Sequence, residues 1–248
     1  MKKLLDVQHL KKNYQTEKEE IHALKDISFD IGEGEFISIV GPSGCGKSTI
    51  LSILAGIEPK SDGSISILNQ KKIGYMLQED CLLPFRTVLD NCLIGLELEH
   101  QLTDENMQYV LSLLDTYGLH DFIYQYPNQL SGGMRQRVAL IRTLATHPDI
   151  LLLDEAMSAL DYQTRLSIGD DLYQIIKKEG KTAIMVTHDI GEAISMSDSV
   201  IVLSQRPSVV KKIYKIQLKE KLTPIQNRSD SLFSKYFNEI WRDLYEEL

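Results

Sequence analysis

A glycine-rich segment in the first quarter of the chain has the composition of a loop that binds phosphate. It reads GPSGCGKST at positions 41 to 49 and lies between a predicted strand and a predicted helix. Glycines in such a loop let successive backbone N–H groups turn toward a phosphate, and the helix N-terminus adds partial positive charge. In the pattern G-x-x-x-x-G-K-[ST], the lysine reaches the β- and γ-phosphates of a nucleotide and the hydroxyl binds Mg²⁺. The predicted nucleotide-binding residues are Gly41, Pro42, Ser43, Gly44, Cys45, Gly46, Lys47, Ser48 and Thr49, and Ser48 is also a predicted metal ligand.

Two carboxylates end the apolar run DILLLDE at positions 149 to 155. Because successive side chains of a strand point to opposite faces, Asp154 and Glu155 are predicted to have different roles. Asp154 is predicted to hold Mg²⁺ through water, and Glu155 to polarise a water molecule that attacks the γ-phosphate. The alternative is an exposed strand end without function, which the upstream phosphate loop makes less favourable.

Three further side chains are candidates for the same site. Gln78 follows the short predicted strand GYML and could reach the metal or the attacking water. His188 stands in VTHD at the end of another predicted strand, where its imidazole could donate to the γ-phosphate. Tyr14 could stack on an adenine ring. Taken alone, each of the three residues also has a purely structural interpretation.

A second pair of glycines stands in LSGGMRQR at positions 130 to 137. Ser131, Gly132 and Gly133 open a predicted amphipathic helix, and together they supply a hydroxyl, backbone N–H groups and a helix dipole that favour an anion. If a helical lobe holds this segment away from the chain's own phosphate loop, two copies arranged head to tail could complete each other's sites. Two ATP molecules would then lie between the copies. A helix cap without a ligand is the alternative.

The elements that must position these residues alternate between strands and helices. Continuous apolar runs typical of strands buried on both faces are EFISIV at 35 to 40, DILLLDE, KTAIMVTHD and DSVIVLS, and SISILNQ and KKIGYMLQ indicate shorter strands. KSTILSILAG and the stretch from about 103 to 122 have helical spacing, with Gly56 as a stop and Thr103 as a cap. Residues from about 80 to 145 show little strand pattern and indicate an inserted helical lobe. The sequence therefore predicts an α/β fold with a mostly parallel sheet.

The C-terminal segment SDSLFSKYFNEIWRDLYEEL is predicted to be an amphipathic helix, after a weak pattern that begins at Pro207. Its apolar stripe favours packing on the core or a contact between subunits over a ligand or membrane site. The stripe consists of Leu232, Phe233, Tyr236, Phe237, Ile240, Trp241, Leu244 and Tyr245.

Composition argues against several other classes of protein. The formal net charge of −8 disfavours general binding to nucleic acid, which needs an excess of Lys and Arg. Cys45, Cys81 and Cys92 are too few and too irregularly spaced for a disulfide framework or a structural zinc site, which favours a reducing compartment. No window approaches the roughly 20 apolar residues of a membrane span. A membrane role would therefore require a partner.

Taken together, these motifs resemble the nucleotide-binding subunit of ATP-binding cassette (ABC) transporters. The resemblance covers about residues 4 to 205 and includes the order GPSGCGKST, Gln78, LSGGMRQR, ILLLDE, SALD and His188. It implies a P-loop NTPase core, a small N-terminal antiparallel β subdomain and an inserted helical lobe, in one ABC ATPase domain over residues 1 to 248. In that domain the lobe would span about 80 to 145 and a C-terminal extension about 206 to 248. It also implies ATP between two subunits, with Asp161 in a loop that crosses between the two sites.

More narrowly, YMLQEDCLLPFRTVLDN, LDEAMSALDYQTRL and VLSQRP are similar to the nitrate, sulfonate and taurine importer branch, which also includes importers of vitamin precursors. In that branch, the region after the glutamine receives a coupling helix of the membrane subunit. Here it would be an apolar groove formed by Leu82, Leu83, Pro84, Phe85 and Arg86.

This sequence departs from the branch at three places. Phe85 replaces a frequent tryptophan, Ala156 replaces a frequent proline, and the stretch between SISIL and KKIGYM is short. None of these changes removes a catalytic group.

The predicted function is an ATPase, with ATP and Mg²⁺, that dimerises on binding ATP and drives a permease from the cytoplasmic face of the membrane. An extracytoplasmic solute-binding protein would be an indirect partner, and no nucleic acid is expected. The main alternative is a soluble ABC ATPase acting on nucleic acid or ribosomes. Such proteins typically carry a long coiled-coil insertion, for which the 53 residues from Gln78 to Ser131 (131 − 78) leave no room. A P-loop kinase or GTPase would leave LSGGMRQR unexplained.

Overall fold

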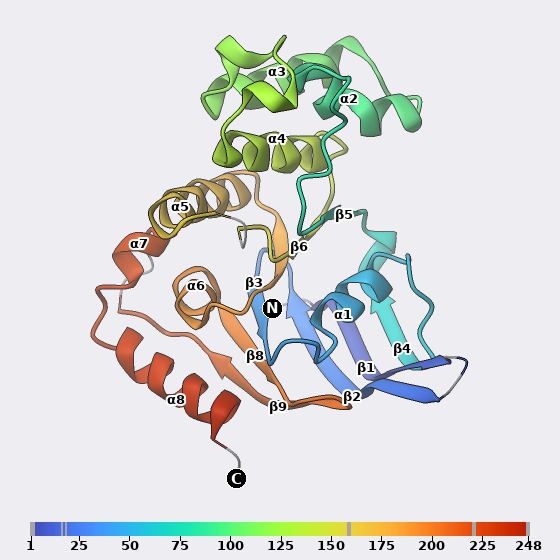
Figure 1. Cartoon of the computed structure of the whole chain (residues 1–248), viewed down its shortest axis with the longest axis vertical. Coiled ribbons are helices and arrows are strands. Elements are labelled where there is room, and N and C mark those ends of the chain that lie inside the picture. Colours follow the sequence, from blue (N-terminus) through green and yellow to red (C-terminus); the bar gives the residue numbers. More distant parts are fainter. Residues whose placement is uncertain (1–2, 16, 18, 158–159, 220–221, 247–248) are drawn as a thin grey trace.

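The structure is a computed structural model that describes residues 3–15, 17, 19–157, 160–219 and 222–246. Within these residues nine strands form one sheet in the order β4-β1-β2-β9-β8-β3-β7-β6-β5 (Figure 1). The strands are β1 (Lys3–Gln15), β2 (Glu20–Gly32), β3 (Phe36–Val40), β4 (Asp62–Ile67), β5 (Ile73–Met76), β6 (Ile150–Asp154), β7 (Thr182–Val186), β8 (Ser199–Leu203) and β9 (Ser208–Lys215).

The central strands of the sheet are parallel and buried. β5, β6, β7, β3 and β8 pair in parallel with one another in this order, and every residue of β3, β6, β7 and β8 is buried. Strands covered on both faces need continuous apolar sequences, which is why the predicted runs form them. The carboxyl ends of these parallel strands meet at one edge, where Val186 pairs with both Ile39 and Asp154. That edge carries most of the residues predicted to bind a nucleotide.

Three outer strands form the antiparallel part of the sheet. β1 pairs antiparallel with β2 and with β4, which confirms the predicted N-terminal antiparallel region. β9 joins this region to the centre, because it pairs with β2 on one side and β8 on the other. The sequence did not predict β9. Its consecutive exposed residues Lys211, Lys212 and Ile213 interrupt the alternation expected of a strand with one buried face.

The helices cover the sheet and form the lobe. They are α1 (Lys47–Leu54), α2 (Val88–Leu98), α3 (Asp104–Thr116), α4 (Gly132–Leu144), α5 (Tyr162–Lys178), α6 (Ile190–Met196), α7 (Pro224–Asn227) and α8 (Phe233–Tyr245), with short 3₁₀ turns η1 (Leu68–Gln70), η2 (His120–Phe122) and η3 (Pro127–Gln129). None of the described helices is long and apolar enough to cross a membrane.

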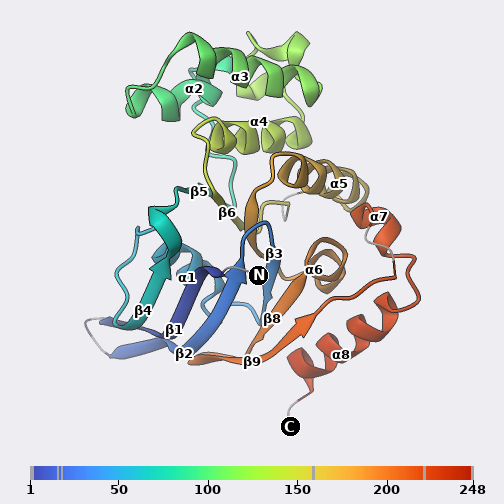
Figure 2. The same cartoon turned by 180° about the vertical axis from the view of Figure 1, so that it is seen from behind.

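The predicted helical lobe consists of α2, α3 and α4, which lie together at one end of the molecule, with α4 over α5 (Figures 1 and 2). Thr103 caps α3 as predicted, since its side chain accepts from the N–H of Asn106. The predicted end of that helix near residue 122 is wrong. α3 stops at Thr116, because Gly118 takes a left-handed φ of +72° and turns the chain.

Helix α8 lies against α6 and β8, far from the lobe (Figure 2). Ile240 is fully buried in this contact, and four other members of the predicted stripe pack around the same cluster: Phe233, Tyr236, Phe237 and Leu244. Packing on the core is therefore confirmed for this part of the stripe. Trp241 and Tyr245, at 49% and 57% exposure, lie at its solvent side.

The buried contact of α8 can be tested by truncating Ile240. Ile240→Ala should lower the free energy of unfolding by about 2–4 kcal/mol, because it leaves a cavity in a closely packed cluster. Urea unfolding followed by circular dichroism measures this loss. Lys235→Ala, on the exposed side of the same helix, is the matched control and should change stability by less than about 0.5 kcal/mol. Equal stabilities for the two variants would contradict the observed docking of α8.

Candidate active site

The glycine-rich loop joins the buried strand β3 to α1, and its shape depends on two glycines. Gly46 has a φ of +104°, and a Cβ there would lie 2.7 Å from Leu24 Cδ2. A Cβ on Gly41 would lie 2.7 Å from Cys45 Sγ. Only glycine lets the chain curl closely over the start of α1 at these positions. The curled loop thus lies at a helix N-terminus, a setting that favours anions.

The remaining loop residues differ in what they can offer a ligand. Ser43 and Gly44 are exposed, and Thr49 is half-buried on α1. Cys45 is buried, its N–H donates to the Pro42 carbonyl oxygen at 3.2 Å, and burial raises the pKa of its thiol. The Cys45 side chain therefore packs inside the loop as a neutral thiol.

Lys47 places a buried positive charge inside the loop. Its side chain is 6% exposed. The ammonium donates to the carbonyl oxygens of Gly41 at 2.9 Å and Pro42 at 3.1 Å. Both partners are neutral, although the charge of Lys47 also favours the ionised form of the nearby Asp154. A phosphate group that enters the loop would meet this buried ammonium.

Ser48 and Asp154 bring two oxygens together across the loop and the end of β6. The Ser48 hydroxyl donates to Asp154 Oδ1 at 2.9 Å, and the Tyr75 hydroxyl donates to Oδ2 at 3.0 Å. Burial raises the pKa of Asp154, although both hydrogen bonds act in the opposite direction. A hydroxyl beside a carboxylate is a donor set that suits Mg²⁺ together with water and phosphate oxygens. The pair therefore fits the predicted metal site.

Glu155 follows the last residue of β6, so the alternation of strand side chains used to predict its direction does not apply to it. Its backbone has a φ of +44°, which is unusual for a residue other than glycine. This conformation places Glu155 Oε2 3.2 Å from His188 Nδ1, in the segment after β7. His188 is 56% exposed at its side chain, whereas Glu155 is 21% exposed. The two predicted catalytic residues therefore meet at the edge of the site.

Ser131, Gly132 and Gly133 begin helix α4 in the lobe. The Ser131 hydroxyl oxygen accepts from the N–H of Met134 at 3.3 Å, which makes it the helix cap considered as the alternative. A Cβ on Gly133 would lie 3.0 Å from Ile168 Cδ1, so this glycine allows α4 to approach α5 closely. Both views separate α4 from α1 (Figures 1 and 2). The structure thus gives the segment a local role, and it does not bring it to the phosphate loop of the same chain.

Gln78 is exposed after β5 and lines an open pocket together with Gly132. The segment that follows Gln78 is attached to the lobe, because Arg135 Nε lies 2.9 Å from Asp80 Oδ2. The first arginine of LSGGMRQR therefore holds the Gln78 segment. This contact links the predicted metal ligand to the helix that Ser131 caps.

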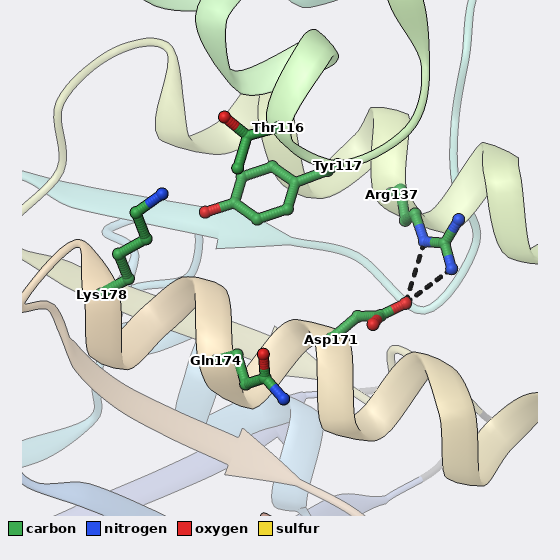
Figure 3. A pocket seen from close by; sticks show the side chains of 6 residues that line it. All are labelled: Thr116, Tyr117, Arg137, Asp171, Gln174 and Lys178. Carbon is green, nitrogen blue, oxygen red and sulfur yellow. Dashed lines mark hydrogen bonds and ion pairs between the residues drawn. The ribbon is translucent and has the colours of Figure 1, made fainter.

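Two further arginines of α4 extend this attachment. Arg142 donates to the carbonyl oxygens of Asp80 at 2.6 Å and Cys81 at 2.8 Å. Arg137 donates from two nitrogens to one oxygen of Asp171 on α5, at 3.1 and 2.6 Å. Figure 3 shows this ion pair at one side of a pocket between the lobe and α5. Arg137 thus fastens the lobe to the core.

Tyr14 is half-buried on β1, where the Lys12 ammonium lies 4.6 Å from the centre of its ring. Lys12 is itself buried and pairs with Glu58 at 2.8 Å. One face of the Tyr14 ring is therefore occupied by a cation. A stacked base would have to use the other face or displace Lys12.

Asp161 caps helix α5, since its Oδ1 accepts from the N–H of Thr164 at 3.1 Å. Hydrogen bonds from Thr164 lower the pKa of this exposed carboxyl. Ser158 and Ala159, the first residues of the SALD motif, lie outside the described residues.

Comparison with known proteins identifies the family. The sequence profile described as ABC transporter matches residues 24–158. An ABC transporter ATP-binding protein of Bacillus subtilis is 46% identical over 97% of this chain and 95% of its own length. The chain belongs to the ABC transporter family. As an ATP-binding member of this family, it is an ATPase whose activity is coupled to transport.

Other similarities support the narrower prediction. A taurine import ATP-binding protein of Rhizobium johnstonii is 43% identical over 77% of this chain and 75% of its own length. ATP-binding proteins named for transport of nitrate and aliphatic sulfonates also match. The predicted resemblance to this importer branch is therefore confirmed.

A solved structure supports the fold of the ABC ATPase. The dimeric structure of an ATP-binding cassette in a post-hydrolysis state, bound to ADP and Pi, matches with a TM-score of 0.75 and 34% identity. The match covers 86% of this chain and 99% of that one. The predicted α/β fold of P-loop NTPase type is thereby confirmed.

The region predicted to contact the membrane subunit begins beside an open pocket. Leu82 is 9% exposed and packs in the hydrophobic core, and it also lines the pocket that contains Gln78 and Gly132. Phe85 is 73% exposed. The buried Asn91 holds the segment, because its Nδ2 donates to the carbonyl oxygens of Leu83 and Arg86, each at 3.1 Å. The exposed ring of Phe85 therefore projects from a loop that Asn91 holds by hydrogen bonds.

Tyr75 is a partner of Asp154 that was not predicted from the sequence. Its position beside Asp154 can be predicted only when the register of β5 against β6 is known. Tyr75 pairs with Leu152 in the parallel sheet, and residues 152 and 154 of one strand share a face. Burial raises the pKa of Tyr75 to about 12, so its hydroxyl remains a donor to Asp154.

The attachment of the Gln78 segment to α4 leads to a testable expectation. Arg142→Gln should lower the free energy of unfolding by about 1–3 kcal/mol, because two backbone carbonyls lose a charged donor. It should also speed amide hydrogen exchange in residues 79 to 83, measured by mass spectrometry. Arg242→Gln breaks an exposed ion pair with Glu246 on α8 and is the matched control. Unchanged exchange in Arg142→Gln would contradict the proposed attachment.

Proposed function

We propose that this ABC ATPase works at the cytoplasmic face of the membrane and powers uptake of a small solute through a permease. The proposed solute class is an oxyanion such as nitrate, a sulfonate or taurine, or a vitamin precursor, in line with the relatives' names. One observation supports the chemistry above all others. Lys47, the Ser48–Asp154 pair and the Glu155–His188 pair lie at the carboxyl ends of neighbouring parallel strands.

The phosphate loop is proposed to bind the triphosphate of ATP, with Lys47 contacting the β- and γ-phosphates. Mg²⁺, when bound, would neutralise charge on these phosphates, and Ser48, Asp154 and Gln78 are the residues proposed to hold it. Tyr14 is proposed to stack on adenine with the ring face that Lys12 does not occupy. The protein's contribution to hydrolysis is then mainly positioning and charge stabilisation.

Glu155 and His188 are proposed to act on the reacting atoms. Glu155 would orient and polarise the attacking water as a general base, and His188 would donate to the γ-phosphate. Their contact of 3.2 Å holds the two side chains toward the same space. A base and a hydrogen-bond donor on adjacent loops suit in-line attack of water on a phosphoryl group.

The site is proposed to be complete only in a head-to-tail homodimer. Ser131, Gly132 and Gly133 of one copy would contact the nucleotide held by the loop of the other, and Asp161 would lie at the crossing between the two sites. The dimeric assembly of the similar cassette supports this arrangement. Phe85 and its neighbours would contact the permease, and a solute-binding protein would take part only through that permease. We propose a single domain for residues 1 to 248, with the lobe and the C-terminal region as parts of it.

The role of Glu155 can be tested by Glu155→Gln. The variant should bind ATP with nearly unchanged affinity but lose about 100-fold or more in turnover, because the amide cannot act as a base. Steady-state release of phosphate and titration with a fluorescent ATP analogue separate the two effects. Glu105→Gln, exposed in the first turn of α3, is the matched control. Near-normal hydrolysis by Glu155→Gln would refute the assignment.

The composite site can be tested by mixing two inactive variants. Lys47→Ala damages the loop and Ser131→Glu damages the other half of the site. Each variant alone should hydrolyse ATP at less than about 1% of the normal rate. In an equal mixture, half of the dimers are mixed and each has one intact site, so activity should recover to about a quarter of the wild-type rate. No recovery, despite dimers detected by light scattering with ATP, would show that each site belongs to one chain.

A further inference from the structure

A buried acidic side chain contacts the residue that precedes His188. Glu192, in the first turn of α6, is 7% exposed. Its Oε2 accepts a short hydrogen bond from the Thr187 hydroxyl, whereas Oε1 is buried and has no hydrogen-bond partner in the described part of the chain. Burying a carboxylate with one oxygen unpaired costs free energy. Glu192 belongs to none of the motifs described above.

The Thr187 hydroxyl joins Glu192 to the segment that carries His188. Thr187 Oγ1 donates to Glu192 and accepts from the N–H of Asp189 at 3.0 Å. Asp189 Oδ1 in turn accepts from the N–H of Glu192 at 2.9 Å. The residues on both sides of His188 are therefore tied to the start of α6. The same segment positions His188 Nδ1 3.2 Å from Glu155 Oε2.

A second set of contacts joins this cluster to the segment before Asp161. Arg165 of α5 lies with its Nη1 3.7 Å from Asp189 Oδ2 and donates from Nη2 to the Leu160 carbonyl oxygen at 3.0 Å. Arg165 and Glu192 line two small pockets together, one of which also includes Glu155 and His188. The charged or titratable groups around Glu192 are Asp189 of α6, Arg165 of α5, Arg228 after α7, His188 after β7 and Glu155 after β6.

We propose that Glu192 is a positioning residue of the hydrolytic site. Its carboxylate orients the Thr187 hydroxyl and thereby holds His188 in place beside Glu155. This inference rests on the roles proposed above for His188 and Glu155. Through Asp189 and Arg165, the same cluster makes the position of His188 depend on the segment that leads to Asp161.

Protonation of Glu192 should weaken this positioning. A carboxylate only accepts hydrogen bonds, so it requires the Thr187 hydroxyl to point toward it, whereas a protonated carboxyl carries a competing donor. Burial raises the pKa of Glu192 to about 7, against the hydrogen bond from Thr187 and the charges of Arg165 and His188. The neutral form therefore dominates below about pH 7 and the charged form above it. Positioning, and with it turnover, should improve as the pH rises through this range.

Glu192→Gln tests the charge without a large change of shape. At about pH 8 the variant should lose about tenfold in kcat while KM for ATP changes less than about twofold, since the reacting groups are misplaced but binding is retained. Its kcat should also lack the rise between about pH 6 and pH 8 that we expect of the wild-type chain. The measurement is steady-state hydrolysis by the full chain across this pH range.

Stability should move in the opposite direction from activity. A raised pKa means that the stabilising contribution of Glu192 is complete below about pH 4.5 and is lost as the pH rises through about 7. Glutamine has no charge to bury, so the melting temperature of Glu192→Gln should exceed that of the wild type at about pH 8 and approach it at about pH 5. A more stable but slower enzyme would separate a positioning role from a merely structural one.

Thr187 provides the matched pair of variants. Thr187→Val removes the hydroxyl with little change of shape and should reduce kcat about tenfold, whereas Thr187→Ser keeps the hydroxyl and should stay within about twofold of the wild type. Wild-type kcat and pH profile in both Glu192→Gln and Thr187→Val would overturn the positioning role, even if Glu155→Gln is inactive. Retained turnover in Glu155→Gln would instead overturn the proposed function itself.

Discussion

The register of the parallel strands β3, β7 and β6 is the constraint on which the site depends. Val186 of β7 pairs with Ile39 on one side and Asp154 on the other, so the segments after all three strands begin at the same level. A shift of β6 by two residues would move Asp154 by about 7 Å and separate it from Ser48. A shift by one residue would turn its side chain to the other face. The continuous burial of these strands therefore fixes the geometry of polar groups that contribute little packing themselves.

Arginine side chains, in addition to the backbone, connect the helical lobe to the rest of the molecule. Arg135 and Arg142 hold the segment after Gln78, and Arg137 holds α5. The partly exposed ion pairs of Arg135 and Arg137 contribute little to stability. They instead fix orientation, because a planar guanidinium sets the relative orientation of the groups that it joins. A displacement of α4 would thus first move the segment that follows Gln78. The same segment leads to the exposed Phe85.

Much of this site follows from the sequence because its parts are local. The phosphate loop needs a strand, glycines and a helix in succession, and Asp154 and Glu155 stand at the end of the apolar run that forms β6. Other features depend on contacts between distant segments. β9 was missed because Lys211, Lys212 and Ile213 break its alternation, and Tyr75 was missed because its role depends on pairing with β6. The left-handed backbone of Glu155 has no sequence signal at all. Glu192 lies only four residues beyond His188 in the chain, yet its burial is a product of the packed fold.

The cap at the start of α4 explains how one segment can have a structural and a functional role in the proposed dimer. Ser131 satisfies the N–H of Met134, which leaves the N–H groups of Gly132 and Gly133 as the first donors of the helix. Each nucleotide would then lie between two helix N-termini. One is that of α1 in the chain whose phosphate loop holds it, and the other is that of α4 in the partner chain. Two chains with a formal net charge of −8 each repel at long range, and two positive helix ends repel at short range. A bound triphosphate converts the second repulsion into attraction for both chains. Association would therefore be strong only while the γ-phosphate remains between the two helices, and its hydrolysis would weaken the contact that completed the site.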